Sequence, residues 1–311
     1  MRTSITLTNF SWPKGNGFAQ ELAEVVQIAD RSGIDTVFVS DHLMQAEPGT
    51  EPTEPMLEAY TTLGYIAAET ERIRLGTMVT AATFRPPALL VKAVTTLDVL
   101  SHGRAWFGIG AGYHQEEADW FGLPLPPTAE RFGWLEDTLR LAIQMWKDDH
   151  SAFTGKHVRA GRPISRPAPL AAPHPPILVG GTGEKKTLRL VARYADACNL
   201  PDIPDGGATI RRKLSVLADH CRSEGRRFDD IEKTVSTRLP PGQTASSFVE
   251  HAKDLAALGI DHLVVLTQGP WSAASLGILA ETVKPIAEIS PTKIANLADL
   301  AGAGISEGAS A

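Results

Sequence analysis

The chain has little cysteine, no cluster of basic residues and no long hydrophobic run, and each shortage excludes a class of protein. Two cysteines, Cys198 and Cys221, are too few for a disulfide framework or a cysteine-bound metal centre. The net charge of -6 argues against a nucleic-acid partner, because phosphate recognition needs clustered lysine and arginine. No apolar stretch approaches the roughly 20 residues that span a bilayer, and MRTSITLTNFSW lacks the apolar core of a signal peptide. We therefore expect a cytoplasmic protein with no membrane or nucleic-acid partner.

The chain does have a regular alternation of short apolar runs and longer helical patterns. TVFVS, ILVGG and HLVVL are continuously apolar, as in parallel strands that are buried on both faces. Apolar residues at helical spacing follow, for example over 18–29, 90–100 and 129–147. Strands are predicted at 5–9, 36–40, 73–80, 105–110, 177–180, 196–200, 234–238 and 262–267.

Strands that alternate with helices in this way predict an α/β protein, a (β/α)8 TIM barrel. An open doubly wound sheet is the alternative, but no GxGxxG opens the first strand–helix turn. We expect one barrel domain over 1–290. Segment 150–176, rich in Pro, Arg and Gly, is interpreted as an insertion that packs over the barrel mouth. Residues 291–311, rich in Ala, Gly and Ser, are interpreted as a mobile C-terminal tail.

Chemically useful residues follow the second predicted strand, and active sites of α/β barrels lie at the carboxyl ends of strands. Asp41 and His42 stand together there. A carboxylate beside an imidazole can transfer a proton, bind a metal or hydrogen-bond a heterocycle. From the local residues alone, a turn-capping Asp beside a solvated His explains the pair equally well. Their place at a strand end favours a functional interpretation.

Glycines alternate along GIGAG at the fourth strand, at Gly108, Gly110 and Gly112. Glycine in a buried strand marks close approach of a ligand or of another backbone, and a flat ring against the strand ends would need that clearance. His114 and Glu116 follow as candidate metal ligands. No second ligand pair at metal-site spacing accompanies them, so we expect no metal.

A second glycine-rich segment, Gly180, Gly181, Thr182 and Gly183, is expected to join the fifth strand directly to a helix. Backbone amides at a helix start bind anions, and glycines let a phosphate approach closely. Barrels often bind phosphate after strands seven and eight, whereas this strand is the fifth. The segment is a phosphate-site candidate on these grounds.

Four segments together resemble the luciferase-like monooxygenase superfamily, which includes bacterial luciferase and the deazaflavin-dependent oxidoreductases. They are VSDH at 39–42, the long run from RIRLGTMVTAATFRPP to GIGAGYHQEE at 72–117, FTGKH at 153–157 and PHPPILVGGTGEKKTLRLVARYADACNL at 173–200. The resemblance implies a bacterial luciferase-like barrel that binds a flavin or deazaflavin at the strand ends, with 150–176 as one of the family's insertions. It also implies a homodimer.

The resemblance also assigns roles to residues. It implies that Asp41 and His42 lie beside the cofactor ring, with His42 taking part in proton transfer. It implies a non-prolyl cis peptide bond between Met78 and Val79, which together with Thr80 supports the ring. The segment from Gly180 to Gly183 matches the loop that holds the cofactor phosphate.

The style of the motifs SDH, TFRPP and GIGAGY resembles the group that uses coenzyme F420. We therefore expect an oxidoreductase that transfers a hydride between coenzyme F420 and a small organic substrate. The alternative is an FMN-dependent monooxygenase that uses oxygen and reduced flavin from a partner reductase. Some F420 dehydrogenases have Glu at the position of Tyr113, so that acid role does not carry over. Tyr113 is expected to orient the substrate, and His42 is the first candidate for proton transfer.

Two other classes of protein are alternatives to an F420-dependent or FMN-dependent oxidoreductase. A metal-dependent hydrolase would use Asp41, His42, His114 and Glu116, but the early HxH pattern of barrel hydrolases is absent from the sequence. A catalytically silent protein would bind the cofactor without turnover, which turnover with either reduced cofactor would exclude.

Overall fold

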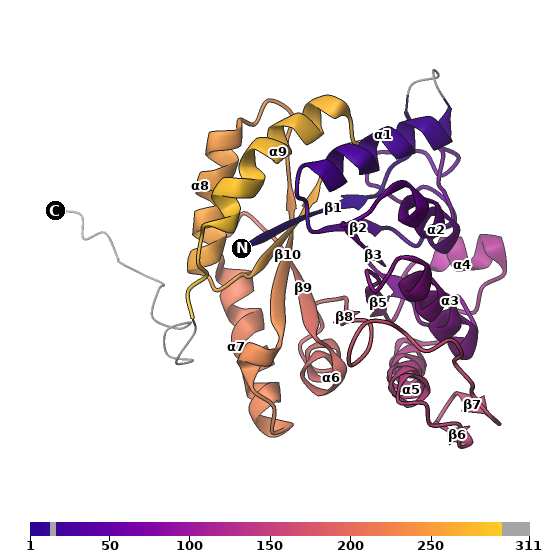
Figure 1. Cartoon of the computed structure of the whole chain (residues 1–311). Helices are drawn as coiled ribbons and strands as arrows, with labels where there is room; N and C mark the ends of the chain where they lie inside the picture. Colours follow the sequence, from indigo (N-terminus) through magenta and orange to yellow (C-terminus); the bar gives the residue numbers. More distant parts are fainter. Residues whose placement is uncertain (13–16, 294–311) are drawn as a thin grey trace.

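Parallel strands form one sheet around a central axis, and the computed structural model describes them within residues 1–12 and 17–293 (Figure 1). In chain order they are β1 (Arg2–Leu7), β2 (Thr36–Val39), β3 (Arg74–Thr77), β4 (Thr80–Ala81), β5 (Phe107–Gly110), β8 (Ile177–Val179), β9 (Ala197–Pro201), β10 (Glu232–Arg238) and β11 (His262–Leu266). A separate antiparallel hairpin consists of β6 (Phe153–Thr154) and β7 (Arg159–Ala160).

The sheet closes into a barrel at its two end strands, β3 and β4. Its order is β3-β2-β1-β11-β10-β9-β8-β5-β4, and the end strands β3 and β4 are two halves of one predicted strand. The backbone N–H of Leu75 donates to the carbonyl of Arg104, and that of Trp106 donates to the carbonyl of Leu75. These bonds join β3 to the chain just before β5, so the predicted (β/α)8 barrel is confirmed.

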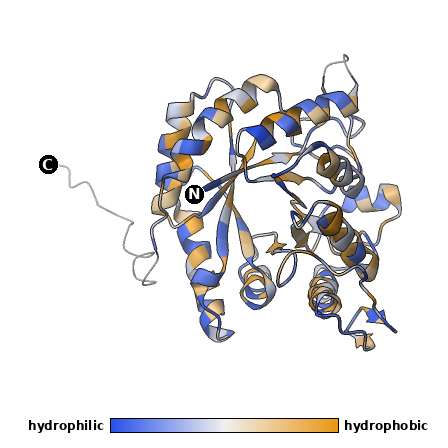
Figure 2. Ribbon diagram, viewed as in Figure 1, coloured by the Kyte–Doolittle hydropathy of each residue, from blue (hydrophilic) through white to orange (hydrophobic). Residues whose placement is uncertain are grey.

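Helices surround the barrel, and Figure 2 shows hydrophobic and hydrophilic residues alternating around them. They are α1 (Phe18–Arg31), α2 (Ala59–Glu69), α3 (Pro87–Leu100), α4 (Gln115–Phe121), α5 (Thr128–Trp146), α6 (Thr187–Tyr194), α7 (Ala208–Ser223), α8 (Ala245–Ala257) and α9 (Ala273–Ala287), with a 3-10 turn at Phe228–Asp230. The apolar face predicted over 18–29 is buried at Leu22, Val25, Val26 and Ala29, whereas Phe18 at its start is exposed.

A small second core fills the inside of the barrel. It consists of Phe38, Trp106, Leu178, Ala197 and Val264, and Met78 and Val79 pack against it. Burying a large apolar side chain contributes about 1.5–3 kcal/mol relative to leaving it exposed. This inner core supports the segment that divides β3 from β4.

A polar cluster lies at the amino ends of the strands. The Oγ of Ser4 lies 2.5 Å from the Nε2 of His262, whose Nδ1 lies 2.7 Å from the Oε1 of Glu232. Burial opposes ionisation of Glu232, but His262 and Arg2 outweigh it and lower the pKa of that carboxyl. Ser4 and His262 are fully buried, so this polar cluster forms part of the interior of the barrel.

The third strand differs from the prediction because its ladder breaks in the middle. The bond between Met78 and Val79 is cis, as the family resemblance implies. β3 pairs with β2 before this bond, and β4 pairs with β5 after it. The single strand predicted at 73–80 is therefore two short strands that change neighbours.

The predicted position of the insertion at 150–176 was wrong. Arg166 accepts a hydrogen bond from Lys92, Leu170 and Ala171 donate to Asp98, and His174 stacks on Trp146. These contacts hold the segment against α3 and α5, on the outside of the barrel (Figure 1). The Pro-rich composition predicted an irregular segment but held no information on which end of the barrel it covers. Of the predicted tail 291–311, residues 294–311 lie outside the described residues.

Candidate active site

A cavity of about 460 Å³ opens at the carboxyl ends of the barrel strands. The predicted site residues that line it are Asp41, His42, Met78, Val79, Gly110, Gly112, Tyr113, Gly180 and Gly181. Thr80, Thr182 and Gly183 are not among its lining residues in the described structure. Residues that are up to 140 positions apart in the chain thus share one surface, because parallel strands end at the same rim.

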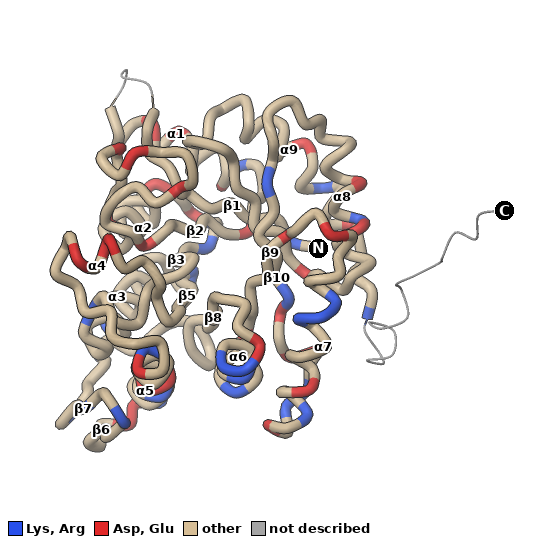
Figure 3. The backbone as a smooth tube through the Cα atoms, turned by 180° about the vertical axis from the view of Figure 1, so that it is seen from behind, with Lys and Arg blue, Asp and Glu red and all other residues tan. Residues whose placement is uncertain are grey.

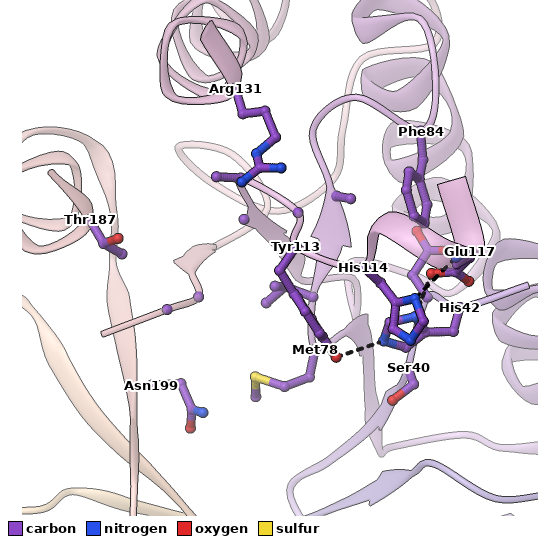
Figure 4. A pocket seen from close by; sticks show the side chains of 18 of the residues that line it. Ser40, His42, Met78, Phe84, Tyr113, His114, Glu117, Arg131, Thr187 and Asn199 are labelled. Carbon is purple, nitrogen blue, oxygen red and sulfur yellow. Dashed lines mark hydrogen bonds and ion pairs between the residues drawn. The ribbon is translucent and has the colours of Figure 1, made fainter. Parts of the chain in front are cut away.

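His42 is held by a buried carboxylate at one end of this cavity. Its Nδ1 lies 2.8 Å from the Oε2 of Glu117, and its Nε2 lies 3.4 Å from the hydroxyl of Tyr113 (Figure 4). The other oxygen of Glu117 accepts a hydrogen bond from the backbone N–H of Leu43. Since Nδ1 is engaged with a carboxylate, Nε2 is the ring nitrogen left to face Tyr113.

Glu117 is fully buried, yet it is held as an anion. Burial opposes its ionisation, but the hydrogen bond and charge of His42 and the N–H of Leu43 outweigh burial, so the pKa of Glu117 lies below its ordinary value. Desolvation of its hydroxyl, aided by the charge of Glu117, raises the pKa of the Tyr113 phenol, although the side chain as a whole is 71% exposed. The phenol is therefore a hydrogen-bond donor at neutral pH.

The position of Glu117 follows from how α4 starts. His114 is the N-cap of α4, and its Nδ1 accepts a hydrogen bond from the backbone N–H of Glu117 at 3.1 Å. The helix ends at Gly122, which is left-handed with φ 63°. His114 thus serves the helix start, which gives it a structural partner in place of the metal role considered from the sequence.

Asp41 lines the cavity, and its carboxylate is paired with Arg85. Both of its oxygens accept from Arg85, at 2.5 and 2.9 Å, and Thr80 donates to one of them at 2.7 Å. Arg85 also donates to Glu58 and lies over the ring of Tyr60. Burial opposes the charge on Arg85, but the two carboxylates outweigh it and raise the pKa of its guanidinium. Asp41 and Thr80 thus fix the loops beneath His42.

The glycines of the fourth and fifth barrel strands make room for Val79. A Cβ at Gly110 would lie 2.9 Å from Val79, and one at Gly180 would lie 2.7 Å from it. Gly108 is approached even more closely, by the backbone carbonyl of Thr77. The clearance predicted for a flat ring is therefore taken up in part by the protein itself, and Val79 is wedged where the two strands end.

The predicted phosphate loop has a different connection to its helix. Gly180 follows β8, but a turn at 184–186 separates Gly183 from α6, which begins at Thr187. The direct strand-to-helix join was therefore wrong. Gly181 has φ +107°, which an L side chain rarely adopts. Thr187 lines the cavity, so the first residue of α6 still borders it.

Sequence reasoning missed two residues of the site. Glu117 is the second of two adjacent acidic residues, and its spacing of three from the N-cap His114 is a helix-start signal. Arg131 was not noted at all, yet it lines the cavity from α5. Arg131 stands four positions after Pro127, near the start of a helix, where the helix dipole disfavours a positive charge. This unfavourable position could have marked Arg131 as a candidate site residue.

Residues 1–12 and 17–293 were searched for a metal site and for a membrane-spanning helix, and neither is found there. In those ranges no three His, Cys, Asp or Glu side chains are grouped so that they could hold a metal ion. No helix there is both long and apolar enough to cross a membrane.

Comparison with known proteins places these features in context. The profile of the family described as luciferase-like monooxygenase matches residues 1–282. F420-dependent glucose-6-phosphate dehydrogenase of Nakamurella multipartita is 28% identical over 243 residues, which cover 77% of this chain and 69% of the relative. An uncharacterized protein of Mycobacterium tuberculosis is 32% identical over 233 residues, which cover 70% of this chain and 79% of the relative.

A solved structure matches nearly the whole chain. It is an F420-dependent secondary alcohol dehydrogenase in complex with an F420-acetone adduct, with a TM-score of 0.77 and 16% sequence identity. The match covers 92% of this chain and 99% of that chain. At this identity the match shows a shared fold.

Proposed function

Because the chain belongs to the luciferase-like monooxygenase family, we propose that it is a coenzyme F420-dependent oxidoreductase. The enzyme transfers a hydride between F420 and a small organic substrate. Its relatives include enzymes named F420-dependent glucose-6-phosphate dehydrogenase, and F420-dependent enzymes share its fold.

One observation carries the proposal: a single cavity joins the His42–Glu117 pair to the Gly180 loop. The first is a proton-transfer group held in one orientation, and the second is a glycine-rich loop beside a helix start, where a phosphate can approach. A cofactor with a reactive ring and a phosphorylated side chain needs both kinds of site at once.

The residues present fit such a cofactor. The cavity volume of about 460 Å³ lies within the range of about 300–1,000 Å³ found for small-molecule and cofactor sites. Met78 and Val79 form an apolar wall, and glycines at 110, 112, 180 and 181 leave the strand ends without side chains. When bound, F420 supplies the carbon centre that gives or accepts the hydride.

The chain's own residues orient the substrate and manage a proton. The Nε2 of His42 and the hydroxyl of Tyr113 converge at the cavity, where a substrate oxygen can hydrogen-bond to both. Glu117 fixes the ring of His42, so Nε2 can hold or accept the proton that accompanies oxidation of an alcohol. Asp41 and Arg85 support this loop from below. Catalysis then rests on orientation and exclusion of water.

Titration of the apo protein tests the cofactor. We expect oxidised F420 to bind tightly and FMN weakly, as followed by fluorescence, and reduced or oxidised F420 to turn over with a carbonyl or alcohol substrate. Glucose 6-phosphate and secondary alcohols are the first substrates to try, from the names of similar proteins. Preference for FMN with oxygen consumption would instead identify a monooxygenase that needs a reductase partner. Binding without any turnover would leave a silent cofactor-binding protein.

We further propose a homodimer located in the cytoplasm, supplied with reduced or oxidised F420 by a second enzyme. Large apolar side chains are exposed on α3 and α4, at Leu89, Leu100, Trp120 and Phe121, and exposed apolar groups of this size favour association. Light scattering after size-exclusion chromatography measures the mass, and a monomer at micromolar concentration would contradict the dimer.

A further inference from the structure

One residue, Glu117, holds two neighbouring histidines of the cavity. Its carboxylate oxygen Oε2 lies 2.8 Å from the Nδ1 of His42, and its backbone N–H donates to the Nδ1 of His114 at 3.1 Å. Both histidines line the cavity, and their ring centres lie 5.8 Å apart (Figure 4). The ring centre of Tyr113 lies 5.8 Å from that of His42 and 5.9 Å from that of His114, so three polar rings surround one place.

The two contacts of Glu117 select opposite tautomers of the two rings. An ionised carboxylate only accepts hydrogen bonds, so a neutral His42 carries its proton on Nδ1 and its Nε2 is an acceptor. A backbone N–H only donates, so the Nδ1 of His114 carries no proton and its Nε2 is a donor. The cavity therefore has one imidazole that accepts at Nε2 beside another that donates at Nε2.

Glu117 can set both rings because its own position is fixed. Its side chain is fully buried, and its second oxygen accepts the backbone N–H of Leu43 at 2.5 Å. Figure 3 shows acidic and no basic residues along α4, so the carboxylate takes its partners from the loop after β2. His114 is the N-cap of α4, so its ring is anchored to the start of that helix. The two tautomers are therefore a fixed property of the folded cavity.

The Nε2 of His114 is available to a ligand. Among the described residues it has no hydrogen-bond partner, and it is accessible rather than buried. A substrate oxygen that meets the Nε2 of His42 and the hydroxyl of Tyr113 can therefore meet this N–H as well. One acceptor and two donors in one place match the oxygen of an alcohol, which gives up one proton and can accept two hydrogen bonds.

We propose that His114 is a further catalytic residue, which donates a hydrogen bond from Nε2 to the substrate oxygen while His42 takes the proton of that oxygen. The inference rests on the proposed function and names its substrate class, an alcohol or the matching carbonyl compound. When the alcohol is oxidised, its C–H bond breaks and the hydride passes to F420, its O–H bond breaks and the proton passes to the Nε2 of His42, and a carbon–oxygen double bond forms. The oxygen is partly negative in the transition state, and the donors of His114 and Tyr113 stabilise that charge. Reduction of a carbonyl uses the same contacts in reverse.

Nitrogen-15 NMR of the cofactor-free protein, labelled in histidine, tests the tautomers without any turnover. At alkaline pH, where imidazoles are neutral, we expect the proton of His114 on Nε2 and that of His42 on Nδ1. The signals of each ring are assigned by their loss in His114→Ser and in His42→Gln. The same tautomer in both rings, or a proton on the Nδ1 of His114, would overturn the proposal.

Kinetics of His114→Ser test the donor. Serine can still cap α4 but removes the N–H from the cavity. With a secondary alcohol or its ketone, kcat should fall about 10- to 100-fold, as expected for one lost hydrogen bond to a developing charge. The dissociation constant of F420, followed by fluorescence, and the melting temperature should stay close to those of the wild type. His114→Leu removes the cap as well and should also lower the melting temperature. Gln115→Ala, at the exposed next position, is the control and should change none of these quantities.

The outcomes separate the donor role from the proposed function. An unchanged kcat in His114→Ser, with a lowered melting temperature in His114→Leu, would reduce His114 to a helix cap and overturn the proposal while the F420-dependent function stands. A loss of F420 affinity as large as the loss of kcat would show that His114 holds the cofactor, and would also overturn it. Failure of the wild type to oxidise any alcohol or reduce any carbonyl with F420 would overturn the proposed function itself, and the donor role with it.

Discussion

His42 lies in the loop after β2 and Glu117 in helix α4, after β5, and the Nδ1 of His42 lies 2.8 Å from the Oε2 of Glu117. Glu117 is fully buried and has a lowered pKa, so it is a fixed anion behind the imidazole. A carboxylate in this position selects the ring orientation and the tautomer of histidine. The geometry therefore makes Glu117 a positioning residue for His42.

Glu117→Gln should lower kcat by about 10- to 100-fold, a part of what a positioned proton-transfer group contributes. Its effect on KM should be small, because Glu117 does not contact the substrate side of His42. The pH profile of kcat/KM should also move, since the His42 ring loses its anion. Glu116→Gln, at the exposed neighbouring position, is the control. An unchanged kcat and pH profile in Glu117→Gln would show that the pair only holds the fold.

Asp41→Asn tests whether Asp41 binds the cofactor or supports the loops. The carboxylate is buried and accepts both arms of Arg85, and removing one partner of a buried ion pair costs about 3 kcal/mol. We expect a clear loss of thermal stability, with the affinity of the folded variant for F420 changed much less. Asp119→Asn, at an exposed position of α4, serves as control. Full stability with weakened F420 binding would restore Asp41 to the direct role that the family resemblance implies.

The sequence predicted what depends on local patterns. The strands were predictable because runs such as TVFVS are apolar on both faces, and their order placed His42 and Gly180 at one rim. The partners were not predictable. His42 meets Glu117 across 75 positions and Asp41 meets Arg85 across 44, and no local pattern reports such contacts. The position of the insertion depends on packing against α3 and α5, which composition does not encode.

Val79 and Gly180 should show strong energetic coupling. An added Cβ at Gly180 would lie 2.7 Å from Val79, and a β-branched side chain in a packed site cannot easily move aside. Gly180→Ala should therefore destabilise the protein by about 1–3 kcal/mol, as overpacking does. Shortening Val79 to Ala in the same chain should recover much of this loss, giving a coupling energy in a double-mutant cycle.

A glycine without close neighbours provides the control for that cycle. Gly64 lies inside α2 with no atom within 4 Å of an added Cβ, so Gly64→Ala should stabilise the protein by about 0.5–1 kcal/mol. Denaturant unfolding measures the free energy of unfolding of the wild type, of the two single variants and the double variant of the cycle, and of Gly64→Ala. Additive effects of Gly180→Ala and Val79→Ala would mean that the packing of Val79 does not require the absence of a side chain at Gly180.

The pair formed by Asp202 and His251 should make stability depend on pH. The Nε2 of His251 lies 2.6 Å from Asp202, whose hydrogen bond raises the pKa of His251 above its ordinary value of 6.5. The same bond lowers the pKa of Asp202. Because the folded state binds the His251 proton more tightly than the unfolded chain does, the stabilisation is complete below pH 6.5 and is lost as pH rises through the folded pKa.

His251→Gln should therefore be less stable than the wild type at pH 5.5, by about 0.5 kcal/mol for a partly exposed pair, and nearly equal to it at pH 9. Thermal unfolding at several pH values gives this difference directly. His102→Gln changes an exposed histidine and should show no such trend. A stability difference that is the same at both ends of the pH range would mean that a neutral hydrogen bond, and not the charge on His251, holds it to Asp202.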